Sequence, residues 1–156
     1  MARIEHFNSP NAPKANSIVV AVTVFVQDEQ GRVLLIQRTD NGLWALPGGA
    51  QDFGEFIAET AVRETREETG IDVEVTGVVG IYSSPNHVVE YSDGEVRQQF
   101  SICFRAQFAA GKPTTSDESS AVRWVPFGEL DTLSIHQSMR LRIAHGFERR
   151  SEPYIG

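Results

Sequence analysis

Cysteine is almost absent from this sequence, and that scarcity excludes two kinds of structure. Cys103 is the single cysteine in 156 residues. It excludes an intramolecular disulfide and any metal site built from cysteines. Because Cys103 lies in an alternating apolar stretch, we expect it to be a buried and unreactive thiol.

Long apolar runs are lacking as well. No run approaches the roughly 20 residues that a membrane helix needs. The N-terminal stretch MARIEHFNSPNAPKANS is polar and has no apolar middle of the kind that a signal peptide carries. We therefore expect a cytoplasmic protein with no membrane partner.

Positive charge is also in short supply. The chain has 14 Lys and Arg against 21 Asp and Glu, a formal net charge of −7. Proteins that coat long nucleic acids usually present a basic surface, so such a partner is not expected. A small phosphorylated ligand is still compatible with the charge, because a bound divalent metal inverts the local potential.

Neither an internal repeat nor a low-complexity linker is present, so we predict a single domain over residues 17–150. A flexible arm (1–16) precedes it and a short tail (151–156) follows. The apolar and turn patterns predict strands near 18–26, 32–37, 73–82, 87–91, 96–108 and 121–125, and helices near 55–69 and 135–148. Strands arranged as hairpins with separate helices indicate the α+β class, with a mixed sheet between helices.

The segment from Arg63 to Gly70 carries the strongest functional pattern. Because each helical residue advances by about 100°, Glu64, Glu67 and Glu68 share one face. Their carboxylates repel one another and lie at the helix end where the macrodipole disfavours anions. A hard cation such as Mg²⁺ would relieve both effects. The alternative is a solvated charged face whose glutamates pair with arginines.

Gly48 and Gly49 lie a few residues upstream of this helix. Glycine permits unusual backbone dihedrals and close approach of a ligand. A carbonyl oxygen of this segment would be able to complete a metal shell, and a plain turn is the alternative.

Together, the two elements resemble the Nudix box of the Nudix hydrolases. The stretch GAQDFGEFIAETAVRETREETGI, residues 49–71, has the family's spacing. The matching positions are Gly49, Glu55, Arg63, Glu64, Glu67, Glu68, Gly70 and Ile71. Thr65 stands where an aliphatic residue is usual, and we expect this to affect packing rather than chemistry because Thr65 is on the core-facing side. The resemblance covers roughly residues 17–148.

The resemblance implies a Nudix-type α/β/α sandwich and a site for Mg²⁺, with Mn²⁺ as the alternative ion. It implies that Glu64 and Glu68 are metal ligands, that Glu67 is a ligand or helper base, and that the Gly49 carbonyl joins them. It also implies that Glu55 and Arg63 form a structural pair that orients the loop and helix for catalysis.

The reaction implied by the resemblance is attack of water on a diphosphate, and it needs a proton acceptor. In many relatives this group, or an extra metal ligand, comes from a downstream loop. Glu118 is our candidate for the catalytic base, and Asp117 is the substitute. An ordinary solvated loop acid is the alternative for Glu118.

Substrate contacts are the least constrained part of the prediction. Arg38 ends a strand and would hold a phosphate by a bidentate contact. Arg97, which alternates with Gln99 on one strand face, would meet phosphate or base. Tyr82 would stack on a base or ribose, with Tyr91 and Trp44 as further aromatic candidates. We expect Trp44 to plug the core instead.

These residues predict a pyrophosphohydrolase that acts on a small nucleotide, in which a nucleoside diphosphate is linked to another group. A substrate of the ADP-ribose or nucleotide-sugar type is favoured, partly because Pro85 lies fifteen positions after Gly70. The alternatives are a nucleoside triphosphate such as an oxidised dGTP, an RNA 5′ end, and a regulator that binds nucleotides without cleaving them. The final helix has an apolar stripe, formed by Ile135, Met139, Ile143 and Phe147, and is basic on its polar side, which carries Arg140, Arg142, Arg149 and Arg150. This helix leaves a homodimer open, and packing on the sheet is the ordinary alternative.

Overall fold

Two long strands form the centre of the molecule. They are β2 (Ser17–Gln27) and β8 (Val96–Gly111), which run parallel from the pair Ser17–Arg97 to the pair Gln27–Gln107. The computed structural model describes residues 3–156. Because successive side chains of a strand point to opposite faces, Val24 and Val26 lie in one core cluster and Phe25 in another. The strand predicted near residues 18–26 is present, and it is buried on both faces only from Val22 to Val26, since Ile18 and Val20 are exposed.

The remaining strands extend this pair into one mixed sheet. They are β1 (Arg3–Phe7), β3 (Val33–Arg38), β4 (Trp44–Ala45), β5 (Gly48–Ala50), β6 (Ile71–Tyr82), β7 (His87–Tyr91), β9 (Ser119–Val125) and β10 (Tyr154–Ile155). The main path has the order β1-β7-β8-β2-β3-β4, while β6 pairs with β8, β9 with β3, β5 with β2, and β10 with β6. The pairing of β6 with β8 shifts register at Gly77 and at Gly80, as β-bulges do.

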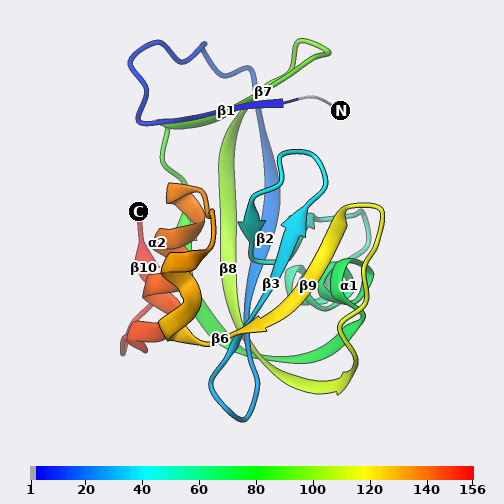
Figure 1. The fold of residues 1–156 in the computed structure, drawn as a ribbon. Helices are drawn as coiled ribbons and strands as arrows, with labels where there is room; N and C mark the ends of the chain where they lie inside the picture. Colours follow the sequence, from blue (N-terminus) through cyan, green and yellow to red (C-terminus); the bar gives the residue numbers. More distant parts are fainter. Residues whose placement is uncertain (1–2) are drawn as a thin grey trace.

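Two helices cover opposite faces of the sheet (Figure 1). Helix α1 (Ile57–Thr69) packs through Ala61 on the cluster that includes Val24 and Leu34, and α2 (Gln137–Glu148) packs through Ile143 on the cluster around Phe25. A short 3₁₀ helix (Phe127–Thr132) precedes α2. The predicted α+β class and the α/β/α sandwich are confirmed.

Gly146 lets α2 approach the sheet closely. A Cβ atom at this position would lie 2.4 Å from the Phe25 ring. Cys103, in the same layer, has no exposed surface, as expected for a structural thiol. Trp44 is buried there too, so its predicted place in the core is confirmed.

Three segments differ from the expectations. Residues 3–7 of the expected flexible arm form β1, which pairs antiparallel with β7 from Arg3–Tyr91 to Phe7–His87; residues 1 and 2 of that arm lie outside the described residues. In the expected tail, β10 pairs with β6. Residues 48–50, for which no strand was expected, form strand β5, paired with β2. These pairings join residues that are distant in sequence, which a local pattern does not reveal.

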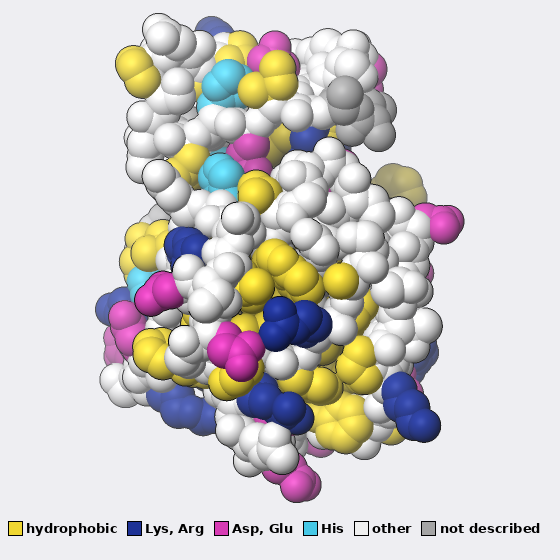
Figure 2. Space-filling model, viewed as in Figure 1, with side chains coloured by type: hydrophobic (Ala, Val, Ile, Leu, Met, Phe, Trp, Pro, Cys, Tyr) yellow, Lys and Arg dark blue, Asp and Glu magenta, His cyan; other side chains and the backbone are white. Residues whose placement is uncertain are grey.

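The β1–β7 pair projects beyond the body of the sheet, at the top of Figure 1. The space-filling view shows this end as a separate bulge, with histidine and acidic side chains near its junction with the body (Figure 2). Within residues 3–156, no helix is long and apolar enough to cross a membrane.

Candidate active site

Helix α1 carries the three predicted carboxylates. Glu64 and Glu67 lie on the side away from its core contacts, whereas Glu68 is buried. Its last turn ends at Gly70, whose φ of 74° is left-handed, and the Gly70 N–H donates to the Arg66 carbonyl. Thr65 is fully buried and its hydroxyl donates to the Ala61 carbonyl at 2.7 Å. The core-facing place predicted for Thr65 is therefore confirmed.

Glu68 is the most enclosed of the three acids. Only 4% of the residue is exposed, and its Oε1 accepts the Gly48 N–H at 2.8 Å. Burial raises the pKa of Glu68 to about 8, and the charges of Glu64 and Glu118 add to that effect, while the Gly48 N–H and Arg38 oppose it. The carboxylate lies where a positive charge would stabilise it strongly.

Glu64 lies against the backbone of Gly49. A Cβ atom on Gly49 would be 2.5 Å from the Glu64 carboxylate carbon, so only glycine leaves room for this side chain. The Glu64 side chain is 12% exposed. Burial raises its pKa, and the nearby charges of Glu67 and Glu118 act in the same direction.

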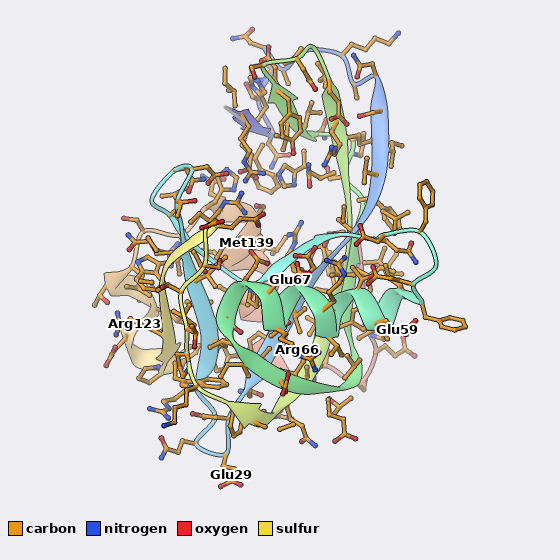
Figure 3. The ribbon with its side chains drawn as sticks, turned by 90° about the vertical axis from the view of Figure 1, so that its right-hand side faces the viewer. Glu29, Glu59, Arg66, Glu67, Arg123 and Met139 are labelled. Atoms are coloured by element: carbon orange, nitrogen blue, oxygen red, sulfur yellow. The ribbon has the colours of Figure 1, made fainter. Side chains whose placement is uncertain are left out.

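Glu67 is placed differently from the other two. Its side chain is 58% exposed and its Oε2 lies 3.2 Å from Nη1 of Arg63. Figure 3 shows Glu67 on the edge of α1 toward the β1–β7 end and Arg66 on the opposite edge. Glu67 thus stands at the rim, where it would reach a metal only by leaving Arg63.

Arg63 and Glu55 make the contact that was expected of a structural pair. Nε and Nη2 of Arg63 donate to the two Glu55 oxygens at 2.6 and 3.1 Å, and Nη2 also donates to the Ala50 carbonyl at 3.1 Å. Hydrogen bonding to Arg63 lowers the pKa of Glu55 to about 2. This network ties the segment after β5 to α1.

Glu118 comes to the same place from the loop before β9. The Ser119 hydroxyl donates to the Glu68 carbonyl at 2.5 Å, and the Thr39 N–H donates to the Glu118 carbonyl at 3.2 Å. These bonds fix the backbone of the loop against α1 and the end of β3. The loop acid that was predicted from the sequence, Glu118, therefore lies beside the acidic helix.

Two hollows meet at these acids. The carboxylate hollow, about 200 Å³, includes Gly48, Gly49, Glu68, Arg97 and Gln99 in its lining. The outer hollow, about 380 Å³, includes Thr39, Asp40 and Asp117. Both are lined by Arg3, Arg38, Glu68, Tyr91 and Glu118. The acids therefore lie between two spaces rather than at the end of one.

Arg38 and Arg97 line the carboxylate hollow as predicted, and each is already held by an acid. Arg38 donates to both oxygens of Asp40 at 2.9 and 2.6 Å. Arg97 donates to both oxygens of Glu95 at 2.9 Å and lies over the Tyr91 ring, 4.8 Å from its centroid. These pairs orient the two guanidinium groups and leave other N–H donors for a phosphate.

Tyr82 is not brought to the acids, contrary to its predicted substrate contact. It is 7% exposed, its hydroxyl lies 2.8 Å from Nδ1 of His145, and its ring stacks on Tyr154. It belongs to the core beneath α2, because strand β6 turns that face inward. Pro85 is exposed and lines neither hollow.

Several residues of the carboxylate hollow were not predicted. They are Arg3, Glu5, His87, Ser138, Met139 and Arg142. The non-local pairing of β1 brings in the first two. Arg142 was placed on the polar side of the final helix and is instead 4% exposed. Its spacing of three residues from Met139 and one from Ile143, on the apolar stripe, was the available signal.

The described residues fit a divalent metal in chemistry, although their side chains are not gathered as ligands. Within residues 3–156, no three His, Cys, Asp or Glu side chains form a group that could hold an ion. Glu64 is paired with Arg63 at 2.9 Å and Glu68 with the Gly48 N–H. The candidate ligands are nevertheless all oxygen atoms, and the pKa values of Glu64 and Glu68 are raised. The absence of a Cβ on Gly49 also lets the Glu64 carboxylate lie against the backbone. Glu64, Glu68 and the Gly49 carbonyl would hold the metal, and Glu67 would join them only by leaving Arg63.

Comparison with known proteins places this site in a family. The model of the NUDIX domain matches residues 18–145. A MutT-like protein of Streptomyces ambofaciens is 37% identical over 114 residues, covering 73% of this chain and 66% of the relative. An ADP-ribose pyrophosphatase of Methanocaldococcus jannaschii is 31% identical over 115 residues, covering 69% and 62%. The chain thus spans about two thirds of the length of these two relatives.

Two further proteins cover the domain more fully. Nucleoside triphosphatase NudI of an Enterobacter species is 31% identical over 127 residues, covering 77% of this chain and 90% of the relative. The crystal structure of an ADP-ribose pyrophosphatase from Streptococcus suis has a TM-score of 0.70 and 22% identity, covering 88% of this chain and 98% of that one. With the matching domain, the shared fold and the acidic helix beside Gly49, this chain belongs to the Nudix hydrolase family.

Proposed function

We propose that the protein is a Mg²⁺-dependent pyrophosphohydrolase, which cleaves a phosphoanhydride bond in a nucleoside diphosphate linked to a second group. The observation that carries the proposal is that Glu68 and Glu118 line, with Gly48 and Gly49, a hollow whose other walls bear arginines, while the Glu64 carboxylate lies against Gly49. Acids that hold a cation and arginines that hold phosphate are the two requirements of phosphoanhydride hydrolysis.

The residues divide the work as follows. A bound Mg²⁺ supplies charge neutralisation on the phosphate oxygens and lowers the pKa of water. Glu118 accepts the proton of the attacking water, since it lines the hollow and is free of the arginine contact that engages Glu67. Arg38 and Arg97 bind the phosphates. Arg63 and Glu55 keep α1 in register with the segment after β5.

The arrangement of the two hollows favours a diphosphate with a group on either side. Since both hollows share Glu68 and Glu118, a diphosphate held at these acids has space in two directions. Tyr91 lines both and offers an aromatic surface for a base. A substrate of the ADP-ribose or nucleotide-sugar type fits this layout, and the relative from Methanocaldococcus jannaschii has a name of that class.

A nucleoside triphosphate is the second candidate. It is favoured by the similarity to nucleoside triphosphatase NudI, because that relative is matched over 90% of its length. A regulator that binds nucleotides without cleaving them is the third, and the intact set of Glu64, Glu67 and Glu68 speaks against it. Use of Mg²⁺, with Mn²⁺ as the alternative ion, and a cytoplasmic location are further parts of the proposal, and a homodimer is left open.

The test is a hydrolysis assay over a panel of nucleotides with and without Mg²⁺. The panel contains ADP-ribose, UDP-glucose, diadenosine polyphosphates, canonical and oxidised nucleoside triphosphates, and an RNA with a 5′ triphosphate. We expect Mg²⁺-dependent cleavage, fastest for ADP-ribose or a nucleotide sugar. Faster cleavage of a triphosphate would replace the favoured substrate class, and silence over the whole panel from folded protein would favour a binding role.

A further inference from the structure

Arg142 is a buried cation without an acidic partner in the described part of the chain. It lies on α2 with 4% of its surface exposed. Its Nε has no hydrogen-bond partner, and the one acceptor near its Nη1 within residues 3–156 is the Met139 sulfur, at 3.9 Å. A thioether is a weak acceptor, and a buried charge that lacks a partner is costly.

The other arginines of the carboxylate hollow are all paired with acids. Arg38 is held by Asp40, Arg97 by Glu95, and Arg3 lies 3.5 Å from Glu5. Arg142 instead lies over the Tyr82 ring, 5.0 Å from its centroid. The nearby acid Glu5 accepts from His87 at 2.6 Å and lies 3.5 Å from the Ser138 hydroxyl. Nε of Arg3 also lacks a hydrogen-bond partner, but it lies 3.6 Å from Oδ2 of Asp40. Arg142 is therefore the arginine of this hollow that has no acid within ion-pair distance in the described part of the chain.

A second cavity adjoins this guanidinium. The α2 cavity, about 250 Å³, lies between α2 and the ends of β1, β6, β7 and β10, and Phe7, Ser84, Ser138 and Tyr154 help to line it. Three residues, His87, Ser138 and Arg142, line both this cavity and the carboxylate hollow. The cavity is large enough for a small ion, and its polar lining offers hydroxyl groups beside the arginine.

We propose that Arg142 binds a phosphate or carboxylate group in the α2 cavity, at a site separate from the acids of α1. The ligand is a small free anion or an anionic end of a nucleotide that occupies the adjoining carboxylate hollow. Either would supply the acceptor that Arg142 lacks, and its planar fork suits both groups. The α2 N-terminus, where Ser138 lies, adds a favourable potential for an anion. The site does not depend on the proposed hydrolysis.

The test follows the side-chain Nε–H resonances of the arginines by NMR while inorganic phosphate is added to the full chain. EDTA is present, so that metal-mediated binding at the acids does not contribute. We expect a saturable shift of the Arg142 resonance. In Arg142→Met the binding detected by the Ser84 and Ser138 amides should weaken by at least about tenfold, the value for losing a charged hydrogen bond.

Arg140→Met is the matched control. Arg140 lies on the same helix, with its side chain 40% exposed and its Nη2 bonded to the Leu133 carbonyl. This variant should bind phosphate as the wild type does. A wild-type titration without a saturable shift, or saturable binding that survives in Arg142→Met, would overturn the proposal. If Arg142→Met does not fold, the wild-type titration decides.

UDP-glucuronate and UDP-glucose distinguish the two sources of the anion, because they differ by one carboxylate. If the anion is the end of a nucleotide, UDP-glucuronate moves the resonances of Arg142 and Tyr91 together and UDP-glucose moves Tyr91 without Arg142. If it is a free ion, inorganic phosphate moves Arg142 and leaves Tyr91 unchanged. Both readouts use binding, so a failed hydrolysis assay does not affect them.

Discussion

Gly49 shows how a missing side chain shapes the site at the scale of one residue. The Glu64 carboxylate occupies the space where a Cβ would lie, at 2.5 Å. We predict that Gly49→Ala raises the Mg²⁺ concentration for half-maximal rate and lowers kcat/KM by about tenfold or more, since displaced ligands cost 10–100-fold. Metal titrations of the hydrolysis rate measure this. Gly128→Ala is the control, because no atom lies within 4 Å of a Cβ there; equal effects of both would contradict the role of Gly49.

Glu118 is the proposed proton acceptor for the attacking water. We predict that Glu118→Gln lowers kcat by about 10²–10⁴-fold, the usual contribution of a general base, with a smaller change in KM. Steady-state kinetics against substrate concentration separates the two. Asp117→Asn is the neighbouring control, since Asp117 lines the outer hollow and not the carboxylate hollow. A change confined to KM would show that Glu118 is no base.

Glu5 links three elements, β1, β7 and the start of α2. It accepts from His87 at 2.6 Å and lies 3.5 Å from Nδ1 of His136. Burial raises its pKa, but the His87 hydrogen bond and the charges of His136, His87 and Arg3 together outweigh burial, and the pKa is about 2 instead of 4.5. A depressed pKa means that Glu5 stabilises the fold above pH 4.5 and that this contribution is lost as the pH falls toward 2.

We therefore predict that Glu5→Gln lowers the free energy of unfolding near pH 5 by up to about 3 kcal/mol. The gap from wild type should shrink as the pH is lowered from 4.5 toward 2. Chemical denaturation at several pH values measures it. Glu74→Gln, at an exposed position of β6, is the control. A gap that is independent of pH would contradict the assignment.

The elements that the sequence predicted well are those set by local pattern. Helix α1 and its stop at Gly70, the apolar strand β2 and the alternation of β8 follow from residues close in the chain. Strand β1 and the burial of Arg142 depend on partners far away, at β7 and Tyr82. The same holds for the site, because the spacing of the box reveals Glu64 and Glu68, while the walls of the hollow come from distant strands.

At the scale of the whole molecule, we expect the buried acids to lower the stability of the metal-free fold, because their positions suit metal binding. Glu68 is buried beside Glu64 and Glu118. Because its pKa is about 8, Glu68 becomes charged in the metal-free protein as the pH rises through 8. In Glu68→Gln the amide oxygen still accepts from the Gly48 N–H, and this buried charge cannot form. We predict that metal-free Glu68→Gln melts at or above the Tm of the wild type. Mg²⁺ should raise the Tm of the wild type and leave that of Glu68→Gln unchanged, because the ion binds the folded state through Glu68.

Thermal unfolding in EDTA and in Mg²⁺ tests this. Glu59→Gln, on the first turn of the same helix, serves as the control and should respond to Mg²⁺ as the wild type does. If metal-free Glu68→Gln melts well below the wild type, the Glu68 charge stabilises the fold without metal. That result would contradict the predicted stability cost of Glu68.

We propose that the acids on α1 make a metal-dependent hydrolytic site. The most direct test is the rate of ADP-ribose cleavage as a function of Mg²⁺ concentration in the wild type and in Glu68→Gln. The account predicts a saturable rise of rate with Mg²⁺ in the wild type and a loss of at least about 10³-fold in the variant, the scale for removing a catalytic electrostatic group. Folded Glu68→Gln that turns over at the wild-type rate with the same Mg²⁺ dependence would contradict it.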